Sequence, residues 1–193
     1  MTKIGYAVEG WRDKAFLAGL ARRWCPGAEL VPGRFRGSSD ETFRRELSKT
    51  CREMLWNGAR FLVILRDANR EDWQEVKKRE LAWLPAEANH CTVFGVTVEN
   101  VEDWLNSDPP YLAERMGIPL EELQAEGDPK AALDRALGAR SSSIAEERIA
   151  AMVHAAPVKR WIQTSRSFEA FYEDARKLAQ RSGVCAITNE RGA

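Results

Sequence analysis

The chain has 193 residues and a mass of 21.8 kDa, and 44% of its residues are hydrophobic, so it is long enough to bury one sizeable core. Its 29 basic and 29 acidic residues cancel, which excludes bulk positive charge as a reason to bind nucleic acid or an anionic membrane. No stretch approaches the ~18 apolar residues of a membrane span, and the amino terminus lacks the pattern of a secretion signal. We therefore expect a cytoplasmic protein without membrane contact, in which a local basic patch would bind any nucleic acid.

The four cysteines are far apart in the sequence and form no Cys-x-x-Cys pair, and only two histidines, His90 and His154, accompany them. A zinc site is therefore not expected, and nothing in the sequence indicates the oxidising compartment in which disulfides persist. We expect reduced thiols, most of them buried, at all four positions: Cys25, Cys51, Cys91 and Cys185.

The first half of the chain alternates strand and helix signals. Short β-branched or apolar runs predict strands, and apolar residues at helical spacing predict the helices between them. This alternation favours an α/β fold with a small, mostly parallel, four-stranded sheet flanked by helices. The predicted strands are 4–8, 28–31, 61–65 and 91–98, and the predicted helices are 11–24, 40–57 and 70–86.

From residue 101 onward, short helical patterns separated by Pro, Gly or Ser replace the alternation, with one further candidate strand at 184–188. We predict an α/β domain over residues 1–108, a helical extension packed on it over 109–183, and a tail over 184–193. The predicted helices of the second half are 101–106, 110–116, 119–126, 129–137, 144–154, 158–164 and 168–180.

Carboxylates follow the ends of the first and third predicted strands. Glu9 follows the first strand, and Asp13 falls in the first turn of the next helix, where the helix dipole favours an anion. Asp67 and Asn69 follow the third strand. Open α/β sheets bind ligands at the carboxyl edge of their strands, and oxygen ligands there are typical of a hard-cation site. Ordinary helix-start and turn residues would explain each pair taken alone.

A third acidic group follows the fourth predicted strand. On a helix from 101, Trp104 and Leu105 share an apolar face while Glu102 points away from it, toward the same edge of the sheet. A solvated helix start explains Glu102 equally well. Trp11, directly after Glu9 and Gly10, is expected at the mouth of the cleft, whereas most of the other six tryptophans are expected in the core.

Three segments together resemble the TOPRIM-type domain: Val8-Glu9-Gly10-x-x-Asp13, Asp67-x-Asn69 and Glu102-x-Trp104-Leu105-x-x-Asp108-Pro109. More narrowly, the chain resembles an uncharacterised TOPRIM-like family with a helical tail that ends in Ser-Phe-x-x-Phe, as at 167–171. The resemblance covers roughly residues 1–175. TOPRIM domains occur in topoisomerases, primases and the overcoming-lysogenization-defect nucleases, and in them a glutamate and an Asp-x-Asp pair organise Mg²⁺.

The resemblance implies a Mg²⁺- or Mn²⁺-dependent nuclease or related phosphoryl-transfer enzyme. Glu9 would be a metal ligand or general acid/base, Asp67 the principal ligand and Asp13 an accessory ligand or water holder, so that these three are the catalytic candidates. Glu102 would complete the metal site. A partner ATPase in a defence or mobile-element context is implied by the same likeness.

The chain departs from the family pattern at Asn69, which stands where the second aspartate is expected. An amide oxygen can still coordinate a cation, but the lost charge weakens the site, and Asp72 could substitute if its loop folds back. Two alternatives therefore stay open: a non-catalytic module with a degenerate acidic site, and a small metal-dependent phosphohydrolase. The choice between one-metal and two-metal chemistry also stays open.

Two basic groups are candidates for phosphate contacts in this otherwise neutral protein. Arg34 and Arg36 lie in the loop after the second predicted strand, and Lys77 and Lys78 belong to a basic run on the third predicted helix. A solvated face explains both groups equally well.

Overall fold

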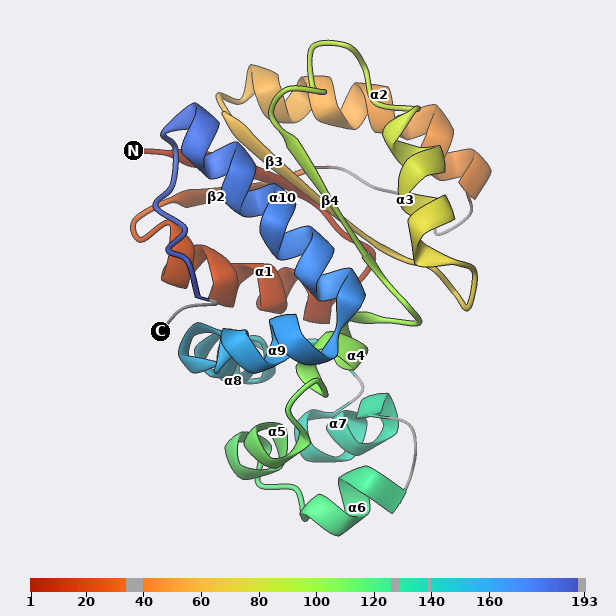
Figure 1. The fold of residues 1–193 in the computed structure, drawn as a ribbon, viewed down its shortest axis with the longest axis vertical. Coiled ribbons are helices and arrows are strands. Elements are labelled where there is room, and N and C mark those ends of the chain that lie inside the picture. Colours follow the sequence, from red (N-terminus) through yellow and green to blue (C-terminus); the bar gives the residue numbers. More distant parts are fainter. Residues whose placement is uncertain (34–39, 126–128, 139, 191–193) are drawn as a thin grey trace.

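The computed structural model describes residues 1–33, 40–125, 129–138 and 140–190. Within them the chain forms an α/β fold around a four-stranded, all-parallel sheet with strand order β2-β1-β3-β4 (Figure 1). The predicted fold class is thereby confirmed. The strands are β1 (Lys3–Ala7), β2 (Glu29–Pro32), β3 (Phe61–Asp67) and β4 (Thr92–Thr97).

The central strand β3 is buried on both faces. Phe61, Val63 and Leu65 point into the larger hydrophobic core, and Leu62 and Ile64 point into a second core on the opposite face. A strand covered on both sides reads as a continuous apolar run, which is why its sequence pattern was the strongest in the chain.

Helices cover both faces of the sheet (Figure 1). The larger core lies under α1 (Trp11–Trp24) and α10 (Arg166–Ser182), and the second core lies under α2 (Asp40–Trp56). Helix α3 (Trp73–Leu81) packs on the same side as α2, with Val76 against Val96 of β4. The result is the expected layer of sheet between two layers of helices.

The second half of the chain continues the larger core. In Figure 1 the helices α5, α6 and α7 form a group beyond one edge of the sheet, and α8 and α9 lie between them and α10. Aromatic rings connect the second half of the chain to the helices that cover the sheet: Trp104 of α4 stacks on Phe171 of α10 at 5.3 Å, and Trp161 of α9 stacks on Phe16 of α1 at 5.9 Å. These helices are α4 (Val101–Leu105), α5 (Pro109–Met116), α6 (Leu120–Ala125), α7 (Pro129–Leu137), α8 (Ser143–Ala155) and α9 (Val158–Thr164).

Two sequence predictions of secondary structure are wrong. The predicted helix 70–86 is shorter, because the Asp72 carboxylate accepts hydrogen bonds from the backbone N–H groups of Gln74 (2.8 Å) and Glu75 (3.4 Å) and so starts α3 at Trp73. The residues before it form a loop in which Asn69 has a φ of 49°. Residues 184–188 form no strand; they run as an irregular segment across the end of α1.

The expectation that all four cysteines are reduced is also wrong. Cys25, at the end of α1, and Cys185, in the C-terminal segment, form a disulfide with their Cα atoms 4.9 Å apart. They are separated by 160 residues, and sequence spacing carries no information about a contact between the two ends of a fold. Cys51 and Cys91 are free and buried, as expected.

Polar contacts hold the C-terminal segment in the same place. The Glu190 carboxylate accepts hydrogen bonds from Nε (2.8 Å) and Nη2 (2.6 Å) of Arg23 and from the Trp24 indole (3.3 Å). The Tyr172 hydroxyl donates to the Thr188 carbonyl (2.7 Å) and accepts from the Glu190 N–H (2.9 Å). The segment is therefore fixed by a covalent bond, an ion pair and a buried hydroxyl.

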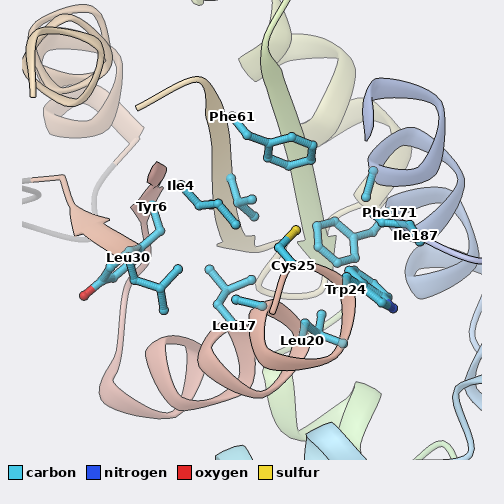
Figure 2. A pocket seen from close by; sticks show the side chains of 13 residues that line it. Ile4, Tyr6, Leu17, Leu20, Trp24, Cys25, Leu30, Phe61, Phe171 and Ile187 are labelled. Atoms are coloured by element: carbon cyan, nitrogen blue, oxygen red, sulfur yellow. The ribbon is translucent and has the colours of Figure 1, made fainter. Parts of the chain in front are cut away.

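An enclosed cavity of about 30 Å³ lies between the sheet, α1 and this segment, with Leu17, Leu20, Phe61 and Ile187 among its lining residues (Figure 2). Its lining is almost entirely apolar, so it offers no group for chemistry and no partners for water. We regard it as a gap in the packing. Among the described residues, no helix combines the length and apolar character needed to cross a bilayer.

We expect the disulfide to contribute about 2–5 kcal/mol to the free energy of unfolding, because it closes a very long loop in the unfolded chain. Urea unfolding of the oxidised protein, with and without dithiothreitol, measures this contribution. A Cys185→Ser variant is the control, since its unfolding should match that of the reduced wild type and should not respond to reductant. Equal unfolding midpoints for the oxidised wild type and the variant would contradict the pairing.

Candidate functional site

The carboxyl ends of β1 and β3 and the first turns of α1 and α4 meet around one open pocket of about 410 Å³. The pocket gathers the four acidic residues selected from the sequence, although they come from segments up to about 90 positions apart. Its lining residues are Glu9, Gly10, Trp11, Arg12, Asp13, Asp67, Asn100, Val101, Glu102, Lys130 and Asp134. We call this the acidic pocket.

Asp13 is a buried carboxylate in the lining of the pocket. It lies in the first turn of α1, is 6% exposed, and accepts a hydrogen bond from the Gly10 N–H at 2.6 Å. Burial, and then repulsion from the charge of Asp67, raise its pKa to about 8. Near neutral pH this side chain therefore carries a proton for most of the time.

Asp67 is the last residue of β3 and faces the pocket from the sheet. Its Oδ1 accepts a hydrogen bond from the Thr97 hydroxyl at 2.8 Å. Burial raises the pKa of Asp67 to about 6, the nearby carboxylates of Glu9 and Glu102 add to this rise, and the Thr97 hydroxyl opposes it. Asp67 is therefore mostly ionised near neutral pH while Asp13 is mostly protonated.

The other two acids are paired with arginines. Glu9 accepts a hydrogen bond from Nη1 of Arg66 at 2.5 Å and one from the Asp67 N–H at 3.3 Å. Glu102 accepts from Nη1 of Arg12 at 2.7 Å, and both of these side chains are buried. The charges of Glu9 and Glu102 are thus compensated within the protein.

Arg66 connects the acidic pocket to the helices on the other side of the sheet. Its side chain is 2% exposed and, besides Glu9, contacts Glu80 of α3 at 3.3 Å and Asp40 of α2 at 3.1 Å. Its guanidinium lies 4.2 Å from the centre of the Phe43 ring. Glu80 is fully buried, and burial raises its pKa to about 7 although Arg66 opposes the shift.

The donor set of the pocket suits a hard cation, because it consists of carboxylate oxygens. Asp13 and Asp67 would hold the cation most directly, since burial and neighbouring carboxylates raise both pKa values and a bound cation would offset that negative charge. The pocket is not a preformed cage: among the described residues, no three Asp, Glu, His or Cys side chains form a group that could hold a metal ion. The carboxylates are chemically suited to a cation, but their side chains would have to move closer together to coordinate it.

Asn69 does not line the pocket. It is exposed, its backbone is in the left-handed region that asparagine tolerates, and its side-chain amide donates to the Asp67 carbonyl at 3.3 Å. The turn after β3 accounts for this residue. Asp72 does not fold back to the pocket either, since it caps α3.

The structure describes two of the four predicted phosphate contacts. Arg34 and Arg36 fall outside the described residues. Lys77 pairs with Asp174 of α10 at 2.7 Å, and Lys78 is an exposed side chain 3.8 Å from Glu75. The structure brings neither lysine to the lining of the acidic pocket.

Sequence reasoning missed the cations that do line the pocket. Arg12 lies between the two acids that drew attention to this segment, and Lys130 comes from α7. Asp134, one turn after Lys130 on the same face of α7, pairs with Arg12. The only signal in the sequence was that Arg12 lies on the same face of α1 as the core residues Ala15 and Phe16, which indicates a buried arginine.

Comparison of the chain with protein-family models, with curated proteins and with solved structures finds no match in any of the three. The TOPRIM resemblance therefore stays a prediction made from the sequence motifs. What the acidic pocket does has to be argued from its own residues.

The raised pKa values predict how stability changes with pH. Between about pH 4 and 8 the folded protein binds more protons at Asp13 and Asp67 than the unfolded chain does, so the free energy of unfolding falls as pH rises. The slope approaches about 1.4 kcal/mol per pH unit for each such proton. We expect Asp13→Asn to flatten the fall at the alkaline end of this window.

Urea unfolding across the window, without divalent cations, measures this effect. Glu99→Gln is the matched control, because it neutralises an exposed carboxylate beside β4 that pairs with Arg70 outside the pocket, and it should keep the wild-type slope. An Asp13→Asn variant with the wild-type slope would show that Asp13 does not hold the proton.

Removing the buried cation should be costly. We expect Arg66→Met to lower the free energy of unfolding by about 3–5 kcal/mol, because it leaves Glu80 buried without its partner. The loss should be smaller at acidic pH, where Glu80 can take up a proton. Arg52→Met, which breaks an exposed pair with Glu87, should change stability little. Similar losses in the two variants, measured by urea unfolding, would refute the role of Arg66.

Proposed function

We propose that the acidic pocket is the active site of a divalent-cation-dependent nuclease or related phosphoryl-transfer enzyme of TOPRIM type. The observation that carries the proposal is the meeting of Asp13 and Asp67, from different segments, at the carboxyl edge of a parallel sheet, with both pKa values raised. A pocket of about 410 Å³ is within the range of small-ligand sites.

A cation held there would neutralise phosphate charge and lower the pKa of bound water. The protein's own groups supply proton transfer. Asp67, with a pKa of about 6, is suited to accept a proton near neutral pH, and Asp13, with a pKa of about 8, is suited to donate one. Glu9 and Glu102 line the same pocket, held by Arg66 and Arg12.

A non-catalytic module with a degenerate acidic site is the alternative, and two observations favour it. Two of the four acids are already paired with arginines, and Asn69 lies outside the pocket. Such a module would bind a cation or a phosphorylated ligand without cleaving it. A partner ATPase stays a proposal from the resemblance, and a cytoplasmic location stays a proposal from the sequence. A cytoplasmic location must be reconciled with the Cys25–Cys185 disulfide, because the cytoplasm keeps most thiols reduced.

Calorimetric titration of Mg²⁺ and Mn²⁺, followed by cleavage assays on single-stranded and duplex nucleic acid, tests the proposal. We expect saturable cation binding and cation-dependent cleavage in the wild type. Asp13→Asn and Asp67→Asn should each reduce the cleavage rate by about 10²-fold or more. Glu99→Gln, outside the pocket, should cleave at the wild-type rate.

Saturable cation binding without cleavage of any substrate would favour the non-catalytic module. No cation binding in the millimolar range would overturn the proposal. Salt dependence separates the two kinds of substrate, because nucleic-acid binding weakens steeply with salt while turnover of a small phosphorylated metabolite does not.

A further inference from the structure

Arg12 is a buried cation that lines the acidic pocket. Its residue is 6% exposed, its guanidinium lies 4.7 Å from the centre of the Trp11 ring, and its Nε has no hydrogen-bond partner among the described residues. A buried guanidinium in the lining of an open pocket has the chemistry to bind an anion there.

The two carboxylates that pair with Arg12 differ in their surroundings. The Glu102 side chain is 4% exposed and holds Nη1, whereas the Asp134 side chain is 33% exposed and holds Nη2. Asp134 can turn toward solvent at low cost, while Glu102 cannot leave without stranding a buried charge. Asp134 is therefore the exchangeable partner.

Phosphate and carboxylate are interchangeable partners for a guanidinium, since both present oxygens to its N–H donors. Lys130 lies one helical turn before Asp134 on α7 and lines the same pocket, so it adds a second positive charge to the pocket lining.

We propose that Arg12 binds a phosphate group of the ligand in the acidic pocket, and that Asp134 occupies the position of this phosphate when no ligand is bound. The inference rests on the proposed function for the kind of ligand, and it adds the residues that recognise it. Asp134 is a built-in competitor: its charge is drawn to the same donors and lowers the affinity of the pocket for any phosphate.

The two charges predict opposite effects of two substitutions. Asp134→Asn removes the competitor and one negative charge, so phosphate should bind about tenfold more tightly. Removing Arg12 should abolish phosphate binding. Because Arg12→Gln alone strands the buried Glu102, the paired variant Arg12→Gln with Glu102→Gln is the one to use.

Calorimetric titration of inorganic phosphate into the cation-free protein, at a mildly acidic pH where Asp13 is protonated, measures these affinities. Glu147→Gln is the matched control. It releases Arg22, another α1 arginine, from a carboxylate that it contacts at 2.6 and 2.7 Å, but on the exposed surface away from the pocket. This control should bind phosphate as the wild type does.

Unchanged or weaker phosphate binding by Asp134→Asn, or wild-type binding by the paired Arg12 variant, would overturn the inference. Repeating the titration with a short oligothymidylate separates the sources of the phosphate: tighter binding of both probes indicates a nucleic-acid ligand, and tighter binding of inorganic phosphate alone indicates a small one. Neither readout needs a cation or cleavage, so a failed cleavage assay would leave this inference standing.

Discussion

The ion-pair network of Arg66 is the interaction on which the rest of this structure depends. A guanidinium in the centre of the sheet has to be compensated, and the compensating acids come from three different segments: Glu9 after β1, Asp40 at the start of α2 and Glu80 on α3. Forming this network therefore fixes both helices of one face and the end of β1 at the same time. Glu9 reaches the pocket with its orientation already set.

The same logic explains how so many acids share one pocket. Arg66 and Arg12 compensate the charges of Glu9 and Glu102, whereas burial and the neighbouring carboxylates keep the pKa values of Asp13 and Asp67 raised. Thr97 and Arg66 lower the pKa of Asp67, and the Gly10 N–H lowers that of Asp13, but burial outweighs these contacts. Buried carboxylates of this kind are costly to stability, and they occur where binding or chemistry benefits from them.

Sequence patterns could predict the parallel sheet, because β3 is apolar on both faces and the strands alternate with amphipathic helices. They could also place Glu9, Asp13, Asp67 and Glu102 at one edge, since parallel strands end together. They could not show the pairing of Arg12 with Asp134, or of Cys25 with Cys185, because these contacts join residues more than a hundred positions apart. The residue type of Asn69 suits both a ligand and a turn, so the sequence could not show that Asn69 lies outside the pocket lining.

The disulfide has a topological consequence for the whole chain. It joins the end of the first helix to the C-terminal segment, so the chain between Cys25 and Cys185 closes into one covalent ring. This ring contains nine of the ten described helices. A protease that cuts any single loop inside this ring leaves two fragments that cannot diffuse apart. The nicked protein keeps both halves of its acidic pocket tethered, with Asp13 on the exocyclic arm and Asp67 within the ring.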